Sequence, residues 1–481
     1  MNREYDFLII GGGAAGYSAA FKAVSQMRVA IIEKGDIGGV CLNRGCIPTK
    51  KMRWIASRYG RNNLKTSLPY HGEQKQLLID DKSIENGVRE AVDDLRNGLV
   101  SSMRNAGIDV YYGNAHSARA DNQEIIVEER NGSEVVLKYK WLLIAAGSQP
   151  VVPQIYNPLF NSKITGNSIF TSDSAFHVEN VLPESILIVG GGVIGVEFAS
   201  IYSDLGVKVI IIEQQDRIIS KFSKDVSRTA ARILRSKGVQ VLTGYRVADV
   251  FEEDEEAVVT IESAEGNTGK EEILVNKILV SVGRESVMNQ GLLDDLGVKY
   301  EHKKICVNEH NETSNKQVYA AGDVCNEIQL AYVASYQGEQ VAERIMNMSS
   351  NGDSNSIEAG CRIDEMVIPS CVFIDPEIVQ IGVNEDHIDK LYKTYAVSKY
   401  SLKGNGMAVL QDNKNGYVKL IVEKESGIVV GAELVCPDAV EMAALCKTWI
   451  DRKITAFEIA HEVFPHPSIS ESLREAAKML I

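Results

Sequence analysis

Two cysteines lie close enough in the sequence to react with each other. Cys41 and Cys46 belong to the stretch Gly-Gly-Val-Cys-Leu-Asn-Arg-Gly-Cys-Ile-Pro-Thr-Lys, which ends at Lys50. A close pair of this kind indicates redox chemistry, in which a thiolate attacks a disulfide sulfur. The alternative is a pair of unrelated buried cysteines, which the flanking glycines and lysine make the weaker interpretation.

The expected local structure favours a reactive thiolate at Cys46. Pro48 suits the first turn of a helix that we expect to run to about Tyr59. Cys46 then lies just ahead of the helix N-terminus, where the helix dipole and free N–H groups stabilise a thiolate. Residues five apart in a regular helix lie beyond ~7 Å, which is too far for a disulfide. Residues 41–46 must therefore form a loop or a distorted turn, which Gly45 helps to permit.

The other cysteines are scattered along the chain. A disulfide framework is typical of small secreted proteins, and a chain of 481 residues is not small. We expect the remaining six to be buried small hydrophobic side chains. They are Cys306, Cys325, Cys361, Cys371, Cys436 and Cys446.

A histidine near the C-terminus could move the protons that thiol–disulfide exchange requires. His466 lies in Phe-Pro-His-Pro-Ser-Ile-Ser-Glu, and histidine is the natural proton acceptor near neutral pH. Ser468 and Glu471 also fit the Ser-x-x-Glu capping box of the last helix, a role that needs no catalysis. The residues by themselves leave the catalytic and the capping interpretations equally open.

Two segments share a glycine pattern that is typical of dinucleotide binding. Asp-Phe-Leu-Ile-Ile-Gly-Gly-Gly-Ala-Ala-Gly ends at Gly16, and Ile-Leu-Ile-Val-Gly-Gly-Gly-Val-Ile-Gly ends at Gly195. In each, a short apolar run, a glycine turn and a helix-compatible stretch lead to a second apolar run that ends in glutamate. These are two βαβ units, so we predict two separate dinucleotide-binding folds rather than two turns without ligands.

Each residue of these motifs has a distinct expected role. The first glycine permits the tight turn, the second lets pyrophosphate approach the backbone, and the third lets the helix pack on the strand. The glutamate hydrogen-bonds a ribose, and in the second unit it favours NAD over NADP, although Arg217 lies nearby. The residues are Gly11, Gly13, Gly16 and Glu33 in the first unit and Gly190, Gly192, Gly195 and Glu213 in the second. Two nucleotide cofactors imply electron transfer between them, and flavin with nicotinamide is the usual pairing.

The composition of the chain is that of an acidic globular protein. At ~100–200 residues per domain, its length predicts about three domains. The formal net charge of -14 disfavours nucleic acid and anionic membranes as partners. The apolar stretch from Phe7 to Ile10 is too short for a signal peptide, and no stretch approaches the ~20 apolar residues of a membrane span. We therefore expect a cytoplasmic protein.

Hydrophobic spacing and polar stretches predict the remaining elements. Val88, Val92, Leu95 and Leu99 give residues 84–106 helical spacing. A strand-rich stretch follows to about residue 145. Polar, glycine-containing stretches lie at 262–272 and 347–356, and the second is the better candidate for a linker. After it we expect strands at 371–374, 417–423 and 428–435 and a last helix from about 469 to 480.

These motifs resemble those of the class I FAD-dependent pyridine nucleotide–disulfide oxidoreductases. The cysteine segment is closer to the dihydrolipoamide dehydrogenase branch than to the glutathione reductase branch. Four further segments resemble family markers in the same order, namely Leu-Leu-Ile-Ala-Ala-Gly-Ser-Gln-Pro (142–150), Ile-Leu-Val-Ser-Val-Gly-Arg (278–284), Tyr-Ala-Ala-Gly-Asp-Val (319–324) and Ile-Pro-Ser-Cys-Val-Phe-Ile-Asp-Pro-Glu (368–377). Three features depart from the family pattern: Ala146 replaces Thr, Ser468 replaces Thr, and Phe464-Pro465 is an unusual approach to the histidine.

The resemblance implies a role for each matching residue. Cys46 is the sulfur next to the flavin, and Cys41 exchanges with the substrate. Lys50 approaches flavin N5 and pairs with Glu197, whereas His466 exchanges protons and Glu471 orients it. The implied FAD contacts are Gly11, Gly13, Gly16, Glu33, Lys34, Gly39, Lys50, Ala115, Gly147, Asp323 and Ala331, with Asp323 on the ribityl chain. The implied NAD contacts are Gly190, Gly192, Gly195, Glu213 and Gly283.

The resemblance also implies an α/β fold with two Rossmann-like domains, for FAD and NAD, and a C-terminal α+β dimerisation domain. The expected boundaries are 1–150 and 281–355 for the two parts of the FAD-binding domain, 151–280 for the NAD-binding domain and 356–481 for the interface domain. Family members are homodimers in which the histidine serves the active site of the other subunit. The implied reaction oxidises a dihydrolipoyl group on a partner protein of a multienzyme complex, with NAD as acceptor.

Two rival functions remain. An NAD(P)H-dependent disulfide reductase of the glutathione or mercuric reductase type is the nearest, but Glu213 argues against NADPH, and no cysteine pair lies at the C-terminus for mercuric ion. The other is a flavin-binding scaffold that docks in a multienzyme complex. Loss of Cys41, Cys46 or His466 would favour it, and all three are present.

Overall fold

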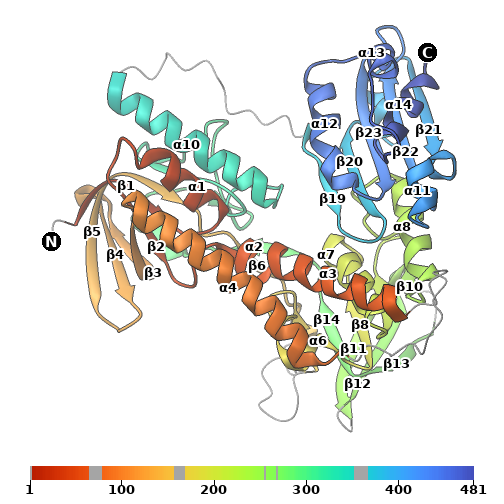
Figure 1. The fold of residues 1–481 in the computed structure, drawn as a ribbon. Helices are drawn as coiled ribbons and strands as arrows, with labels where there is room; N and C mark the ends of the chain where they lie inside the picture. Colours follow the sequence, from red (N-terminus) through yellow and green to blue (C-terminus); the bar gives the residue numbers. More distant parts are fainter. Residues whose placement is uncertain (1–2, 64–78, 157–167, 254–255, 267–268, 352–366) are drawn as a thin grey trace.

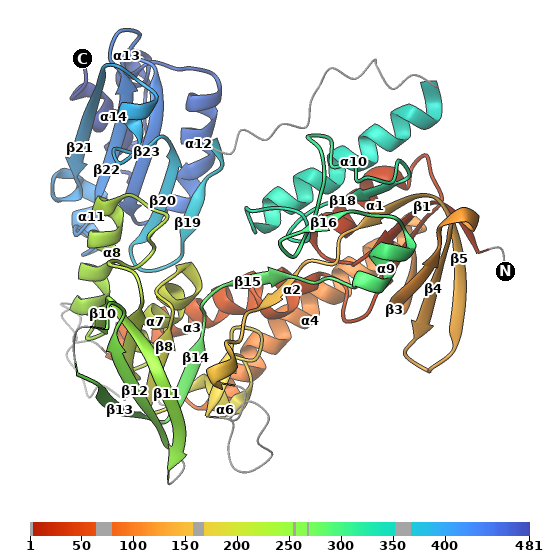
Figure 2. The same cartoon turned by 180° about the vertical axis from the view of Figure 1, so that it is seen from behind.

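A computed structural model describes residues 3–63, 79–156, 168–253, 256–266, 269–351 and 367–481. Its ribbon contains three main sheets: one at the N-terminal end, one in the yellow-green middle of the chain and one in the blue C-terminal part (Figure 1). The same three bodies are distinct from behind (Figure 2). Among the described residues, none of the helices combines the length and apolarity needed to cross a membrane.

The first sheet is built on the N-terminal βαβ unit. Strand β1 (Glu4–Ile10) pairs in parallel with β2 (Val29–Glu33) and with β5 (Glu134–Ile144), and α1 (Ala14–Ala23) connects β1 to β2. β18 (Val318–Ala320), from much later in the chain, pairs in parallel with β5. β3 (Asp109–Arg119) pairs in parallel with β2, and β4 (Glu124–Glu129) runs antiparallel between β3 and β5. This sheet therefore joins two distant parts of the sequence, as the resemblance implied.

Helix α10 (Ala331–Asn351) covers α1 on the first sheet (Figure 1). A Cβ atom at Gly338 would lie 2.1 Å from the carbonyl oxygen of Ala15, so only glycine permits this close approach. The helix extends into the expected linker at 347–356, so that prediction is wrong for its first five residues because the polar stretch continues the helical turn. Residues 352–356 lie outside the described part of the chain.

Two long helices, α3 (Cys46–Asn63) and α4 (Asp81–Ala106), run side by side from the first sheet towards the second (Figure 1). α4 confirms the helix predicted at 84–106 and begins three residues earlier. Its N-cap is Asp80, whose carboxylate accepts a hydrogen bond from the backbone of Ser83 at 2.9 Å. Leu95 is 50% exposed, although its spacing placed it on the apolar face.

The second sheet is parallel and contains the second βαβ unit. Its strands, in sheet order, are β10 (Gln240–Thr243), β9 (Lys208–Glu213), β8 (Ser185–Val189), β14 (Lys277–Val280) and β7 (Ile169–Thr171). An antiparallel sheet of β11 (Tyr245–Glu253), β12 (Glu256–Ser263) and β13 (Glu271–Val275) lies beside it (Figure 2). The polar stretch predicted at 262–272 spans the connection between β12 and β13.

The third sheet is antiparallel and carries the C-terminal helices. Its strands, in sheet order, are β19 (Ser370–Val372), β20 (Glu377–Gly382), β23 (Val429–Cys436), β22 (Tyr417–Glu423) and β21 (Tyr395–Ser401). The helices are α12 (Ala439–Asp451), α13 (Ala456–His461) and α14 (Glu471–Lys478). The three predicted strands are confirmed to within two residues at each end, and the last helix begins and ends two residues inside its expected limits.

One hydrophobic cluster connects the second sheet to the long helices and to the start of the third sheet. It contains Met52 of α3, Val88 of α4, Phe198 of α7 (Val193–Asp204) and Val372 of β19, all buried. Because apolar burial favours keeping these elements together, the redox helix α3 is held by packing from two neighbouring bodies. This packing fixes where the side chains of α3 point.

Candidate active site

The two reactive cysteines lie on either side of a break between two helices. Cys41 belongs to the short helix α2 (Gly39–Arg44), and Cys46 is the first residue of α3. Gly45 makes the break with φ -133° and ψ -106°. Residues 41–46 therefore do not form a loop, because Cys41 and Cys46 both lie in helices. Helix α3 begins two residues before Pro48. The expected distortion is confirmed, because Gly45 interrupts the helical path and brings the two thiols into hydrogen-bond contact.

The two sulfur atoms have different acidities. The hydrogen bond from the Cys41 thiol lowers the pKa of Cys46 to about 7, and the positive charge of Lys50 acts in the same direction. The same hydrogen bond and burial raise the pKa of Cys41. Cys46 is therefore the thiolate of the pair near neutral pH, as its position at a helix start predicted.

Lys50 and Glu197 form the ion pair that the resemblance implied. The Nζ atom of Lys50 lies 2.9 Å from Oε2 of Glu197, which is buried on α7. The other oxygen, Oε1, accepts a hydrogen bond from the backbone N–H of Phe373 at 3.0 Å. The ring of Phe373 also lies under the ammonium group, 4.0 Å from its Nζ. The sequence analysis identified the segment that contains Phe373 but missed these contacts, because Phe373 lies far from Lys50 and Glu197 in the sequence.

His466 and Glu471 are also paired. Nδ1 of His466 lies 2.8 Å and 3.1 Å from the two carboxylate oxygens of Glu471. The backbone N–H of Ser468 donates to the same carboxylate at 2.7 Å, and the Ser468 hydroxyl accepts from the Glu471 N–H at 3.3 Å. The two hydrogen bonds of the expected capping box therefore coexist with the histidine contact on one carboxylate, but they lie in the turn before α14, whose N-cap is Ser470 and has no side-chain cap. Nothing in this geometry makes the two interpretations exclusive.

The first glycine motif adopts the expected turn. Gly11 has φ +104°, and a Cβ there would lie 2.2 Å from the carbonyl oxygen of Ala145. A Cβ at Gly16 would lie 1.9 Å from the carbonyl oxygen of Gly11, whereas the nearest atom to one at Gly13 is 3.7 Å away. The backbone is thus open at the second glycine, where a pyrophosphate must approach, and closed at the other two. These features fit FAD.

Glu33 has a structural contact that the sequence did not reveal. Its two carboxylate oxygens accept hydrogen bonds from the backbone N–H groups of Gly12 at 2.7 Å and Gly35 at 2.6 Å. The same carboxylate therefore holds the glycine turn in place. Each oxygen retains a lone pair that a ribose hydroxyl could use.

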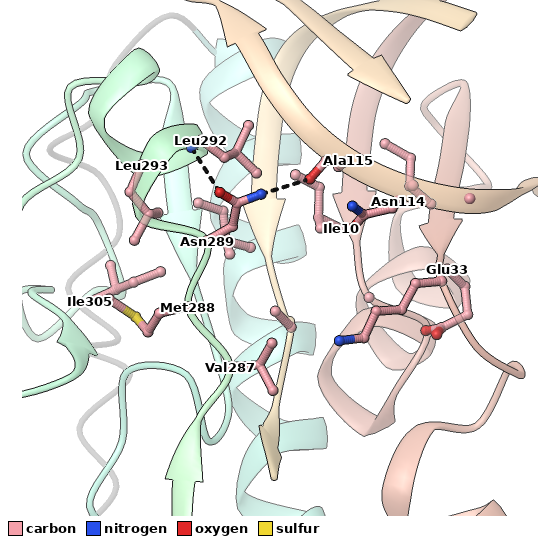
Figure 3. Close-up of a pocket in the computed structure, with 16 residues that line it drawn as sticks. Ile10, Glu33, Asn114, Ala115, Val287, Met288, Asn289, Leu292, Leu293 and Ile305 are labelled. Atoms are coloured by element: carbon pink, nitrogen blue, oxygen red, sulfur yellow. Dashed lines mark hydrogen bonds between the residues drawn. The ribbon is translucent and has the colours of Figure 1, made fainter. Parts of the chain in front are cut away.

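A pocket lies at the carboxyl ends of β1 and β2 (Figure 3). Four residues predicted to contact FAD line it: Gly11, Glu33, Lys34 and Ala115. Sequence reasoning missed Asn114, next to Ala115, and the opposite wall, which contains Val287, Met288, Asn289, Leu292, Leu293 and Ile305 (Figure 3). Asn289 joins the two sides, because its side chain accepts from the N–H of Leu292 at 3.2 Å and donates to the carbonyl of Ala115 at 3.4 Å (Figure 3). A largely apolar cleft with a few polar groups suits an adenine ring.

The other predicted FAD residues do not line this pocket. Gly39 lies against the first motif, since a Cβ there would be 2.7 Å from Cα of Gly13. Gly147 and Asp323 follow β5 and β18, and the Asp323 carboxylate accepts from the Ser148 hydroxyl at 2.5 Å. Ala331 begins α10. All of these residues follow strand ends or begin helices, which is where α/β folds bind cofactors.

The second glycine motif repeats the first. Gly190 has φ +106°, and a Cβ at Gly195 would lie 2.0 Å from the carbonyl oxygen of Gly190, whereas nothing lies within 4 Å of one at Gly192. Glu213 accepts hydrogen bonds from the N–H groups of Gly191 at 2.7 Å and Gln215 at 2.8 Å. Glu213 therefore holds the second glycine turn in the way that Glu33 holds the first. This arrangement fits a second dinucleotide.

Two residues near the second motif have their own contacts. Arg217, whose position left the choice of nicotinamide open, donates to the carbonyl of Ser220 at 3.1 Å. Gly283 follows β14 with φ +138°, and the neighbouring Ser281 donates to the carbonyl of Gly190 at 3.1 Å. The predicted NAD contact at Gly283 therefore lies beside the glycine turn.

The burial predicted for the other cysteines is partly wrong. Cys436 and Cys446 are buried, and Cys325 and Cys371 are partly buried. Cys306 is exposed, because it follows the short strand β17 (Lys304–Ile305), whose Ile305 fills the core position. Cys361 lies outside the described residues.

Comparison with known proteins agrees with this geometry. The model of the pyridine nucleotide-disulphide oxidoreductase family matches residues 5–338, and that of its dimerisation domain matches 368–477. A dihydrolipoyl dehydrogenase of Bacillus subtilis (strain 168) is 31% identical, with 99% of this chain and 98% of the relative covered. Dihydrolipoyl dehydrogenase 3 of Haloarcula marismortui is also 31% identical, with 98% and 96% covered.

Solved structures have the same fold. The HOCl-induced flavoprotein disulfide reductase RclA from Escherichia coli superposes with a TM-score of 0.83 at 25% identity, over 99% of this chain and 100% of that one. LpdA from Mycobacterium tuberculosis superposes with a TM-score of 0.85 at 24% identity, over 99% of both chains. The chain therefore belongs to the pyridine nucleotide–disulphide oxidoreductase family, whose members use FAD and NAD(H), and it ends in the dimerisation domain of that family.

Proposed function

We propose that this protein oxidises dihydrolipoyl groups, carried by a partner protein of a multienzyme complex, to lipoyl groups with NAD as the final acceptor. The observation that carries the proposal is the thiol pair in which Cys46 is acidic and lies near the charge of Lys50. The relatives named dihydrolipoyl dehydrogenase support the choice of substrate. We further propose that residues 1–150 and 281–355 bind FAD, 151–280 bind NAD and 356–481 form the subunit interface.

The proposed half-reaction exchanges one disulfide for another. His466 accepts a proton from a substrate thiol, and the resulting thiolate attacks the sulfur of Cys41 in the Cys41–Cys46 disulfide. Cys46 leaves as a thiolate, which the charge of Lys50 stabilises. The second substrate thiolate then displaces Cys41, so that the substrate ends as a disulfide and the enzyme as a dithiol. FAD, when bound, supplies a two-electron relay between these thiols and NAD.

His466 acts, in this proposal, on the thiol pair of the partner subunit. Its side chain is 79% exposed in the single chain. In both views, α14, which begins just after it, lies at the far end of the C-terminal body from α2 (Figures 1 and 2). A dimer built through the dimerisation domain offers the histidine a second thiol pair to serve.

The test of the proposed function is turnover of the purified flavoprotein. We expect rapid oxidation of dihydrolipoamide with NAD and much slower oxidation with NADP, because Glu213 repels a 2′-phosphate. Equal or better rates with NADP would contradict the nicotinamide assignment. Replacing Cys41 with Ser should leave FAD bound and abolish turnover, whereas the matched change at the exposed Cys306 should retain it.

A second candidate is reduction of disulfides by NAD(P)H. The structural likeness to RclA, described as a flavoprotein disulfide reductase, favours it. It predicts that reduced nicotinamide drives the reduction of glutathione disulfide or another small disulfide faster than dihydrolipoamide is oxidised. Measuring both directions on one preparation separates the two functions.

A further inference from the structure

The connection between β19 and β20 of the third sheet contacts α3, the helix that begins with Cys46. Arg53 of α3 donates to the carbonyl of Ile374 at 2.9 Å and to the carboxylate of Glu377 at 3.0 Å. The second oxygen of Glu377 accepts from the N–H of Val440, at the start of α12. The partly buried Arg53 therefore connects α3 to the dimerisation domain, through the backbone of Ile374 and the side chain of Glu377.

Phe373 occupies the centre of this contact. Its backbone N–H donates to Glu197 at 3.0 Å, and its ring lies 4.0 Å from Nζ of Lys50. The guanidinium of Arg53 lies 5.9 Å from the same ring, one helical turn beyond Lys50. One residue of the dimerisation domain thus contacts both members of the Lys50–Glu197 pair.

We propose that Phe373 is a positioning residue, which holds the ammonium group of Lys50 at the redox centre. The inference rests on the proposed function, because it assigns Lys50 to the chemistry of the thiol pair. The carboxylate of Glu197 attracts the ammonium from one side, and the negative face of the ring attracts it from another. Two separate attractions define a position, whereas one leaves a long, flexible lysine free to pivot about its partner.

The arrangement connects the dimerisation domain to the electrostatics of Cys46. Other titratable groups around the thiol pair and Lys50 include Glu197 of α7, Tyr17 of α1, Tyr332 of α10 and Cys371 of β19, and the charge of Lys50 acts on Cys46. If the ring is lost, the ammonium can move towards solvent, and its stabilisation of the thiolate falls. The hydrogen bonds of Arg53 to Ile374 and Glu377 hold this connection against α3, which keeps the ring beside Lys50.

The experiment measures Cys46 directly in the full-length holoprotein. In a Cys41→Ser background, Phe373→Leu, Phe373→Met and Phe373→Tyr are compared by the pH dependence of alkylation of Cys46, followed by peptide mass spectrometry. We expect Leu and Met to raise the alkylation midpoint by about 0.3–0.7 pH unit, as loss of a partly exposed cation–π contact implies. Tyr, which keeps the ring face, should leave the midpoint unchanged. All three variants retain the backbone N–H that serves Glu197.

Cys306 is the internal control, because it is exposed and its alkylation midpoint should be the same in every variant. An unchanged Cys46 midpoint in Leu and Met overturns the proposal, and so does a Tyr variant that shifts as much as they do. If Leu does not fold, Met, with its flexible side chain, decides the outcome. Alkylation needs no substrate, so a protein that fails to oxidise dihydrolipoamide can still show the shift. Failure of the proposed function is therefore distinguishable from failure of this inference.

Discussion

Two charged pairs in this molecule have similar contact distances but differ in how exposed they are to solvent. Lys50 and Glu197 lie 2.9 Å apart, and His466 and Glu471 lie 2.8 Å apart. In each pair the glutamate also accepts a hydrogen bond from a backbone N–H, that of Phe373 in one and that of Ser468 in the other. The side chain of Glu197 is 7% exposed, whereas that of His466 is 79% exposed.

The difference indicates two kinds of function. The first pair joins residues 147 positions apart on different bodies, so its loss affects how α3 is held. The second pair joins residues five positions apart, and its local turn presents the histidine to whatever approaches. We therefore expect changes at Glu197 to act on stability and changes at His466 to act on rate.

The largest expected effect is at the exposed pair. His466→Gln keeps size and polarity but cannot exchange a proton near neutral pH. Dihydrolipoamide turnover should fall by at least the ~10²–10⁴-fold expected for a general acid–base group. The melting temperature should barely change, because the side chain is largely in solvent. If His466→Gln keeps most of its activity, the turn from His466 to Glu471 serves only as a cap, and another residue must accept the proton.

At the buried pair, Lys50 and Glu197, we expect the substitution to lower stability. Glu197→Gln preserves volume but leaves Lys50 without its counter-charge. We expect the free energy of unfolding to fall by about 1–3 kcal/mol, less than for a fully buried pair, because the Lys50 side chain is 31% exposed. Thermal unfolding of the holoprotein measures this, with Glu471→Gln as the matched control at the exposed pair. If Glu197→Gln and Glu471→Gln destabilise the protein equally, burial does not distinguish the two pairs.

Ser468→Ala separates the cap from the histidine. It removes the hydroxyl that accepts from the N–H of Glu471 but leaves the histidine contact in place. Loss of the cap should cost about 0.5–2 kcal/mol of stability. Turnover should stay near that of the unaltered protein while the dimer persists. A large loss of turnover with an unchanged melting temperature would assign Ser468 to catalysis instead.

The sequence predicted the local parts of these sites better than the distant ones. Gly11, Gly16 and Glu33 were predictable because one βαβ unit contains the turn, the helix and the strand end. His466 and Glu471 are also close in the sequence, but the residues themselves left catalysis and capping equally open, and the family resemblance supplied their pairing. No local pattern pairs Lys50 with Glu197, and only the family resemblance suggested that contact.

The failures share a physical cause. Phe373, Asn114 and Met288 were missed because each reaches its site from a segment that local periodicity cannot connect to it. Cys306 was expected to be buried because cysteine usually is, but the short strand before it already fills the core with Ile305. The start of α3 was misplaced because a single glycine break allows helix on both of its sides.

The smallest expected effect is the pH dependence of the Glu471 contact. The hydrogen bond with His466 is the main cause that lowers the pKa of Glu471 below its ordinary value near 4.5. A carboxyl group whose pKa is lowered on folding adds stability that is present above its unfolded pKa and lost as the pH falls through its folded pKa. The difference in melting temperature between the unaltered protein and Glu471→Gln should therefore shrink as the pH falls below about 4.5. Because the pair is exposed, we expect it to contribute no more than about 1 kcal/mol.

Gln can still accept from the N–H of Ser468 and bond the ring, but it cannot stabilise an imidazolium, so turnover should lie between those of Ser468→Ala and His466→Gln. A melting-temperature difference that grows as the pH falls below about 4.5 would show that this carboxylate opposes folding and would separate the exposed pair from the buried one in sign as well as size.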